Sequence, residues 1–236
     1  MATIVLVGGA FLGAWAWERV TPVLVSAGHD VLPLTLTGLG DRADLGSTAT
    51  TMATHATDIA DAIEGADLRD VVLVAHSYGG IPATVAASRV HGRISRLVYV
   101  AAALPEPGRS LFDRFPPGLE DIVLRAVDTE GDGWRIPALT DVQLDTYWPG
   151  HGFSPEDRAW LQARMGGQPV NTYRDRAPED LSTVEALPRT YVVCAADPGE
   201  PPRIPGMDMV TLDSGHWPMV TRPAELARVI DQLARA

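Results

Sequence analysis

The chain is predicted to form an α/β domain in which about six mostly parallel strands carry helices on both faces. Short apolar runs alternate with longer amphipathic stretches over residues 3–101. The runs are apolar at nearly every position, which is typical of strands covered on both faces. The length of 236 residues suits one large α/β domain, and an apolar fraction of 46% can supply its core.

The same pattern places the elements in order. Strands are predicted at residues 3–7, 30–36, 71–74 and 95–101, and helices at 14–27, 54–64 and 79–90. Gly28 stands where a glycine commonly follows a helix end. Two further strands are predicted at 189–195 and 207–212. A last helix begins near Pro223, and its apolar stripe consists of Leu226, Val229, Ile230 and Leu233.

The alternation stops between residues 104 and 187. This segment is rich in Pro, Asp and Trp, contains short helical pieces such as 155–165, and shows no strong strand pattern. A long insertion between strands indicates a cap or lid. We therefore predict an α/β core formed by residues 1–103 and 188–236, with a helical lid formed by residues 104–187.

The composition excludes several classes of function. A net charge of −11 argues against nucleic acid and anionic membranes as partners, since both require basic patches. All 19 basic residues are arginine, which excludes a Schiff-base lysine and a P-loop lysine. The single cysteine, Cys194, excludes an internal disulfide and is expected in the core. No histidine pair has metal-ligand spacing, so no metal site is expected.

The first apolar run, at residues 4–7, is too short for a signal peptide or a membrane span and has no basic residues before it. We therefore predict a cytoplasmic protein.

A serine follows the third predicted strand directly, in the pentapeptide Ala75-His76-Ser77-Tyr78-Gly79. A strand that runs through a serine between small residues into a helix is typical of a nucleophile elbow, a sharp turn that exposes the hydroxyl. A serine hydroxyl needs a base, usually a histidine held by a carboxylate. The pentapeptide therefore predicts nucleophilic catalysis by Ser77.

Candidate partners of Ser77 follow the last two predicted strands. Asp197 comes just after the strand at 189–195, and His216 lies in the loop after the strand at 207–212. The carboxyl ends of parallel strands meet at one edge of a sheet, where ligands bind. We expect Asp197 to orient His216 and His216 to act as the base; Asp208 and Asp213 are rival acids by proximity. The backbone N–H groups of Ala10 and Tyr78 are the expected oxyanion hole.

These segments together resemble the α/β-hydrolase superfamily, and within it the small bacterial esterases related to plant methylesterases and hydroxynitrile lyases. The resemblance rests on residues 6–17, 27–29 and 35–40, on the Ser77 pentapeptide, and on Ser214-Gly215-His216-Trp217-Pro218. It implies the α/β-hydrolase fold and an ester or related acyl hydrolase that uses Ser77, Asp197 and His216 without metal or cofactor. Hydroxynitrile lyases of this group place a lysine beside the histidine, where this chain has Trp217.

The chain departs from this family in three places. Gly8-Gly9 stands where members commonly have His-Gly, and Ala75 replaces the usual first glycine of the elbow. Asp197 and His216 lie only 19 residues apart, and the prolines between them exclude the helix that the family usually fits there. One flank of the sheet is therefore expected to be barer, and a homodimer in which a partner subunit covers it is a hypothesis.

Aromatic and small residues near these loops are the candidate walls of an apolar substrate pocket. They are Gly9, Phe11, Leu12, Tyr78, His76, Trp134, Trp148 and Trp217. Such walls suit a small apolar or aromatic ester. His55 is expected to cap or face solvent on a helix, and His151 is expected at the surface.

Three functions are consistent with the sequence. The favoured one is a serine esterase that works through an acyl-enzyme intermediate. The second is a non-hydrolytic enzyme on the same scaffold, such as a lyase, a cyclase or a cofactor-free oxygenase, because one fold hosts many chemistries. The third is a former hydrolase that senses a small molecule.

Overall fold

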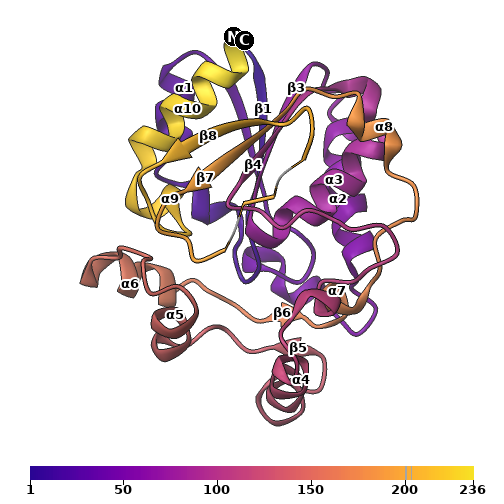
Figure 1. Cartoon of the computed structure of the whole chain (residues 1–236), viewed down its shortest axis with the longest axis vertical. Coiled ribbons are helices and arrows are strands. Elements are labelled where there is room, and N and C mark those ends of the chain that lie inside the picture. The colour runs from indigo at the N-terminus through magenta and orange to yellow at the C-terminus, as the bar shows by residue number, and fades with distance from the viewer. Residues whose placement is uncertain (200, 203) are drawn as a thin grey trace.

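A six-stranded parallel sheet runs through the centre of the molecule (Figure 1). The computed structural model describes residues 1–199, 201–202 and 204–236. Every neighbouring pair of strands in this sheet is parallel. In spatial order the strands are β2 (Asp30–Leu34), β1 (Thr3–Val7), β3 (Val71–His76), β4 (Ile94–Val100), β7 (Arg189–Cys194) and β8 (Asp208–Leu212). The predicted α/β architecture is confirmed.

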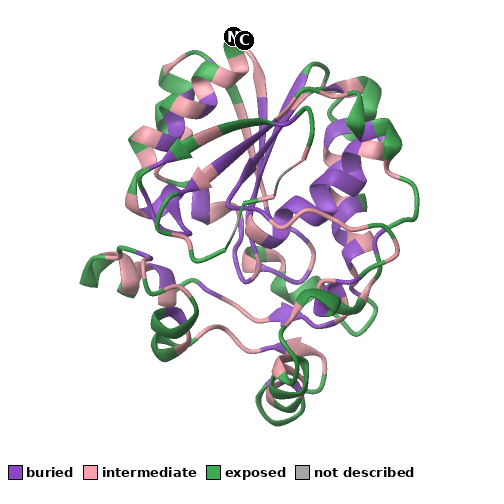
Figure 2. Ribbon diagram, in the orientation of Figure 1, coloured by how far each residue is buried: buried purple, intermediate pink, exposed green. Residues whose placement is uncertain are grey.

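Helices cover both faces of the sheet and enclose two apolar cores. One face carries α1 (Thr21–Ser26), α9 (Pro218–Thr221) and α10 (Pro223–Arg235). The other carries α2 (Met52–Gly65), α3 (Gly80–Arg89) and α8 (Ser182–Glu185). Successive strand residues point to opposite faces, so Ile4 and Leu6 of β1 join the first core while Val5 and Val7 join the second. Figure 2 shows the central strands buried and the outer helix faces exposed.

Most of the segment between β4 and β7 lies beyond the carboxyl ends of the central strands, while its last helix, α8, lies beside α3 (Figure 1). Its elements are η5 (Phe112–Arg114), α4 (Leu119–Glu130), β5 (Arg135–Ile136), α5 (Asp141–Tyr147), α6 (Pro155–Gln162), β6 (Gln168–Pro169), α7 (Asn171–Arg174) and α8. We call residues 104–187 the inserted segment. The remaining short 3-10 helices are η1 (Ala14–Trp17), η2 (Gly40–Leu45), η3 (Ser77–Gly79) and η4 (His91–Arg93).

Two expectations about these elements were wrong. The helix predicted at 14–27 is divided into η1 and α1, because Pro22 cannot donate its backbone nitrogen to a preceding turn and instead sits in the first turn of α1. The inserted segment also contains a small antiparallel sheet, in which Arg135 pairs with Pro169 and Ile136 with Gln168. Two residues on each strand are too few to produce a period-two pattern.

The connection from β7 to β8 contains no helix among its described residues, as the prolines predicted; Glu200 and Arg203 lie outside the described residues. Edge strand β8 is mostly exposed, which agrees with a barer flank, while the homodimer stays a prediction.

Cys194 is buried at the end of β7, and burial raises the pKa of its thiol to about 11. Within the described ranges, no helix is long and apolar enough to cross a membrane.

Replacing Leu73 by alanine tests the central packing. Leu73 lies on β3 with none of its surface exposed. We expect Leu73→Ala to lower the free energy of unfolding by about 2–5 kcal/mol, because a cavity remains in a close-packed core. Urea unfolding measures the change. Met209→Ala on exposed β8 is the control, with an expected change below about 0.5 kcal/mol; equal losses would contradict the assigned core.

Candidate active site

Ser77 lies on the sharp turn between β3 and α3. Its φ of 53° is in the left-handed region, which a non-glycine residue rarely adopts and which marks a strained turn. The turn is possible because small residues surround it: a Cβ on Gly79 would lie 2.4 Å from the carbonyl oxygen of Gly8. The strand–serine–helix geometry predicted for the pentapeptide is therefore present.

A chain of hydrogen bonds joins Ser77 to the two predicted partners. The Oγ of Ser77 lies 2.9 Å from Nε2 of His216, and Nδ1 of His216 lies 2.8 Å from Oδ2 of Asp197. A carboxylate only accepts, so Nδ1 carries the proton and Nε2 is left to accept from the serine hydroxyl. The short connection between β7 and β8 thus still allows Asp197 to reach His216.

His216 is enclosed by aromatic rings. The ring of Trp148, from the end of α5, lies 5.2 Å from it at an angle of 33°. The ring of Trp217 packs edge-on at 4.7 Å and in turn contacts Trp148 and Phe153. His216 keeps 7% of its surface exposed, so the apolar surroundings exclude most water from the base.

The loop after β1 brings Ala10 close to Ser77. A Cβ on Gly9 would lie 2.7 Å from Cβ of Ser77, so only glycine lets the backbone approach this closely. Ala10 is half-buried, and within the described ranges its N–H donates to no other protein group. Tyr78 lies in the first turn of η3, where backbone N–H groups lack intrahelical partners. The loop that carries Ala10 thus lies against the serine turn, and the oxyanion hole formed by Ala10 and Tyr78 stays a prediction.

His76 supports the loop that carries His216. Its Nε2 donates to the carbonyl oxygen of His216 at 2.7 Å, because a carbonyl can only accept. The side chain is fully buried, and burial followed by the neighbouring His216 lowers its pKa well below the usual value. His76 is therefore a neutral packing residue behind the reactive groups and has no exposed surface to offer a substrate.

His55 is buried beneath Tyr78, so the expectation that it faces solvent was wrong. Its Nε2 donates to the carbonyl oxygen of Thr37 at 2.8 Å, and its Nδ1 accepts from the Tyr78 hydroxyl at 2.9 Å. Burial lowers the pKa of His55 to about 4. His151 is also buried, donating from Nε2 to Asp145. The helical pattern could not reveal the burial of His55, because its partners Thr37 and Tyr78 lie far from it in the chain.

The other candidate pocket residues divide into three groups. Trp148 lies directly on His216, as described above. Phe11, Leu12 and Trp217 are nearly fully buried in the first core, where Phe11 and Leu12 follow the oxyanion loop. Trp134 packs against Gly46 and stacks with Arg135 instead, so it is not among the rings that enclose His216.

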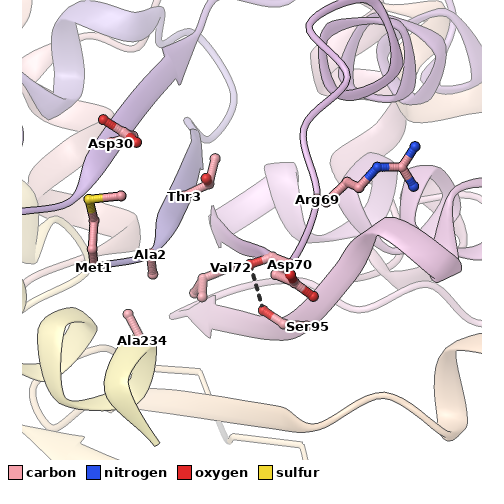
Figure 3. Close-up of a pocket in the computed structure, with 9 residues that line it drawn as sticks. All are labelled: Met1, Ala2, Thr3, Asp30, Arg69, Asp70, Val72, Ser95 and Ala234. Atoms are coloured by element: carbon pink, nitrogen blue, oxygen red, sulfur yellow. Dashed lines mark hydrogen bonds between the residues drawn. The ribbon is translucent and has the colours of Figure 1, made fainter.

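A surface hollow lies at the opposite edge of the sheet. It is lined by Met1, Ala2, Thr3, Asp30, Arg69, Asp70, Val72, Ser95 and Ala234 (Figure 3). These residues stand at the amino ends of the strands, whereas Ser77 stands at a carboxyl end. In the parts of the chain that the structure describes, no cluster of three or more His, Cys, Asp or Glu side chains could hold a metal ion.

Comparison with known proteins agrees with this fold. The sequence model of the alpha/beta hydrolase family matches residues 4–229. The chain belongs to the alpha/beta hydrolase family. Among curated relatives of this hydrolase, the carbendazim hydrolyzing esterase of Nocardioides sp. (strain SG-4G) is 33% identical over 99% of the chain and 100% of the relative. Methylesterase 9 of Arabidopsis thaliana is 29% identical over 96% and 95%.

Solved structures show the same hydrolase fold. An extracellular alpha/beta-hydrolase from a Paenibacillus species, described as sharing structural and functional homology with tobacco salicylic acid binding protein 2, superposes with a TM-score of 0.87. It is 21% identical, and the match covers 100% of both chains. Tomato methylketone synthase I in complex with 2-tridecanone has a TM-score of 0.77 at 20% identity, covering 99% of this hydrolase and 98% of the synthase.

Replacing Gly9 by alanine tests the close approach of the oxyanion loop. The new Cβ would collide with Ser77 and with Nδ1 of His76, 2.8 Å away, so the loop must shift. We expect kcat/KM for an aryl ester to fall by about 10²–10³, the usual effect of losing one oxyanion donor. Gly65→Ala is the matched control, since nothing lies within 4 Å of its new Cβ. Unchanged hydrolysis by Gly9→Ala would contradict the site.

The buried neutral state of His55 predicts a dependence of stability on pH. Its pKa is about 4 in the folded chain and near 6.5 when unfolded, so the unfolded state binds more protons as the pH falls below 6.5. His55 therefore stabilises the fold fully above pH 6.5, and this contribution decreases by about 1.4 kcal/mol per pH unit down to pH 4.

Urea unfolding at pH 7 and pH 4.5 measures this effect. We expect the wild type to lose about 2–3 kcal/mol more than His55→Gln over this interval. All other titrating groups are shared, so the difference between the two proteins isolates His55. Equal losses would show that His55 titrates normally.

Proposed function

We propose that this hydrolase is a serine-dependent carboxylic ester hydrolase acting on a small apolar or aromatic ester. The observation that carries the proposal is the hydrogen-bond chain from Ser77 through His216 to Asp197. The curated relatives named above are esterases, which supports the same reaction class. The aromatic rings around His216 favour an apolar substrate.

The first half of the reaction forms an acyl-enzyme. Oγ of Ser77 attacks the ester carbonyl carbon while Nε2 of His216 takes the hydroxyl proton. The carbonyl oxygen becomes an oxyanion, which the N–H groups of Ala10 and Tyr78 stabilise. As the intermediate collapses, the bond to the alkoxy oxygen breaks, and His216 returns the proton to the departing alcohol. Asp197 stabilises the transient imidazolium and keeps Nδ1 protonated.

The second half releases the acid. A water molecule takes the place of the alcohol, gives a proton to Nε2 of His216 and attacks the acyl carbon. The second intermediate uses the same two amides. Its collapse returns the proton to Oγ of Ser77 and frees the carboxylic acid, so the groups end as they began.

The inserted segment is proposed to act as the lid of this site. Trp148 covers one side of His216, and Gly150 lies so close to the acid loop that a Cβ there would be 2.5 Å from the carbonyl oxygen of Ala196. This segment therefore limits the access of water and substrate to the reacting groups. The shape of its inner surface would determine which esters enter.

Replacing Ser77 by alanine tests the proposed function. We expect Ser77→Ala to lower kcat for short aryl esters by about 10⁴-fold or more, because the nucleophile is lost while binding remains. Asp197→Asn should cause a loss of comparable size, since the amide no longer holds the required tautomer. Steady-state kinetics measure both effects.

Ser88→Ala is the matched control, because Ser88 lies on the helix that follows the elbow and its hydroxyl donates to the carbonyl oxygen of Val85. It should stay within about twofold of the wild type, as expected of a surface change. Undiminished hydrolysis by Ser77→Ala would refute the nucleophile.

A further inference from the structure

Gln168 joins the inserted segment to the oxyanion loop. It begins β6, has no exposed surface, and its Oε1 accepts from the backbone N–H of Phe11 at 3.0 Å. The two residues lie 157 positions apart in the chain. A fully buried amide in a long-range contact requires a partner for each of its polar atoms.

The orientation of the Gln168 amide follows from its other contacts. Its Nε2 donates to Oγ1 of Thr172 at 2.7 Å, and the Thr172 hydroxyl donates to the carbonyl oxygen of Pro169 at 2.6 Å. Since the hydroxyl proton is committed to Pro169, Oγ1 can only accept from Gln168. The oxygen of Gln168 must therefore face Phe11.

Phe11 needs this support because its backbone is in an unfavourable conformation. Its φ is 68°, a left-handed value that costs energy for a residue with a side chain. Both of its backbone polar groups are held from the inserted segment: Gln168 accepts from its N–H, and Gly166 donates to its carbonyl oxygen at 3.2 Å. The preceding residue, Ala10, has an N–H that donates to no group among the described residues.

We propose that Gln168 is a positioning residue for the oxyanion hole. By holding the N–H of Phe11 in place, it keeps the turn in which the N–H of Ala10 points toward the developing oxyanion. This inference rests on the proposed ester hydrolysis. Gln168 acts through Phe11 and does not touch the reacting atoms. Its loss should therefore weaken binding of the transition state more than binding of the substrate.

Replacement of Gln168 by methionine removes the acceptor at similar size. The Phe11 N–H is then buried without a partner, and the turn that carries Ala10 relaxes. We expect kcat to fall about 10–100-fold while KM changes by less than about threefold, since displacing a donor costs less than removing it. The affinity for an aryl trifluoromethyl ketone, which forms a tetrahedral oxyanion on serine, should fall in parallel with kcat/KM.

Two further variants separate positioning from general destabilisation. Tyr99→Phe removes another buried hydrogen bond, from Tyr99 to Oγ1 of Thr84, in the second apolar core, which contains α3. It should unfold more easily yet keep its kcat. Gln168→Glu retains an oxygen acceptor for Phe11 and should keep more of kcat than Gln168→Met.

The outcomes are distinct. A lower kcat in Gln168→Met, partial retention in Gln168→Glu and normal kcat in Tyr99→Phe support the proposal. Wild-type kcat in Gln168→Met, or equal losses in all three variants, would overturn it. If Gln168→Met does not fold, Gln168→Glu provides the test. A loss of kcat in Gln168→Glu as large as the loss caused by Gly9→Ala would overturn the proposal. Full hydrolysis by Ser77→Ala would refute the proposed function itself, independently of Gln168.

Discussion

The strained turn at Ser77 is the constraint around which the rest of the site is arranged. A left-handed serine between a buried strand and a helix persists only if its surroundings hold it. Those surroundings are unusually close: Gly79 lies against the carbonyl of Gly8, and Gly80 lies against the carbonyl of Ala103. The parallel sheet supplies this rigidity, because β1, β3 and β4 end side by side with both faces covered.

The inserted segment supports the loops that follow the strands at the carboxyl edge of the sheet. Beyond the sheet edge, the segment contacts the three loops that carry the proposed oxyanion donor, acid and base. Gln168 bonds to Phe11, Gly150 packs on Ala196, and a Cβ on Gly215 would lie 2.6 Å from Cα of His151. The segment thus contacts each of these three loops. It therefore supports the proposed site as well as covering it.

Much of this could be predicted from the sequence, because local patterns determined it. Buried strands show as apolar runs, and Ser77, Asp197 and His216 follow such runs closely, so parallel topology alone brings them to one edge. The division of residues 14–27, the small β5–β6 sheet and the burial of His55 could not be predicted. The burial of His55, like that of Gln168, depends on hydrogen bonds between residues far apart in the chain, and such bonds leave no periodic pattern in the sequence. The packing of the Trp134 ring against Gly46 is likewise a contact between distant residues that leaves no pattern in the sequence.

The central claim is that Ser77 becomes covalently acylated during turnover. Rapid acid quench of the wild-type protein with a short aryl ester, followed by peptide mass spectrometry, tests it directly. We expect the acyl group on the peptide that contains Ser77, where it appears in a burst before steady-state release and is absent from Ser77→Ala. Steady hydrolysis with no acyl-enzyme under conditions that slow deacylation, or an acyl group on another residue, would contradict it.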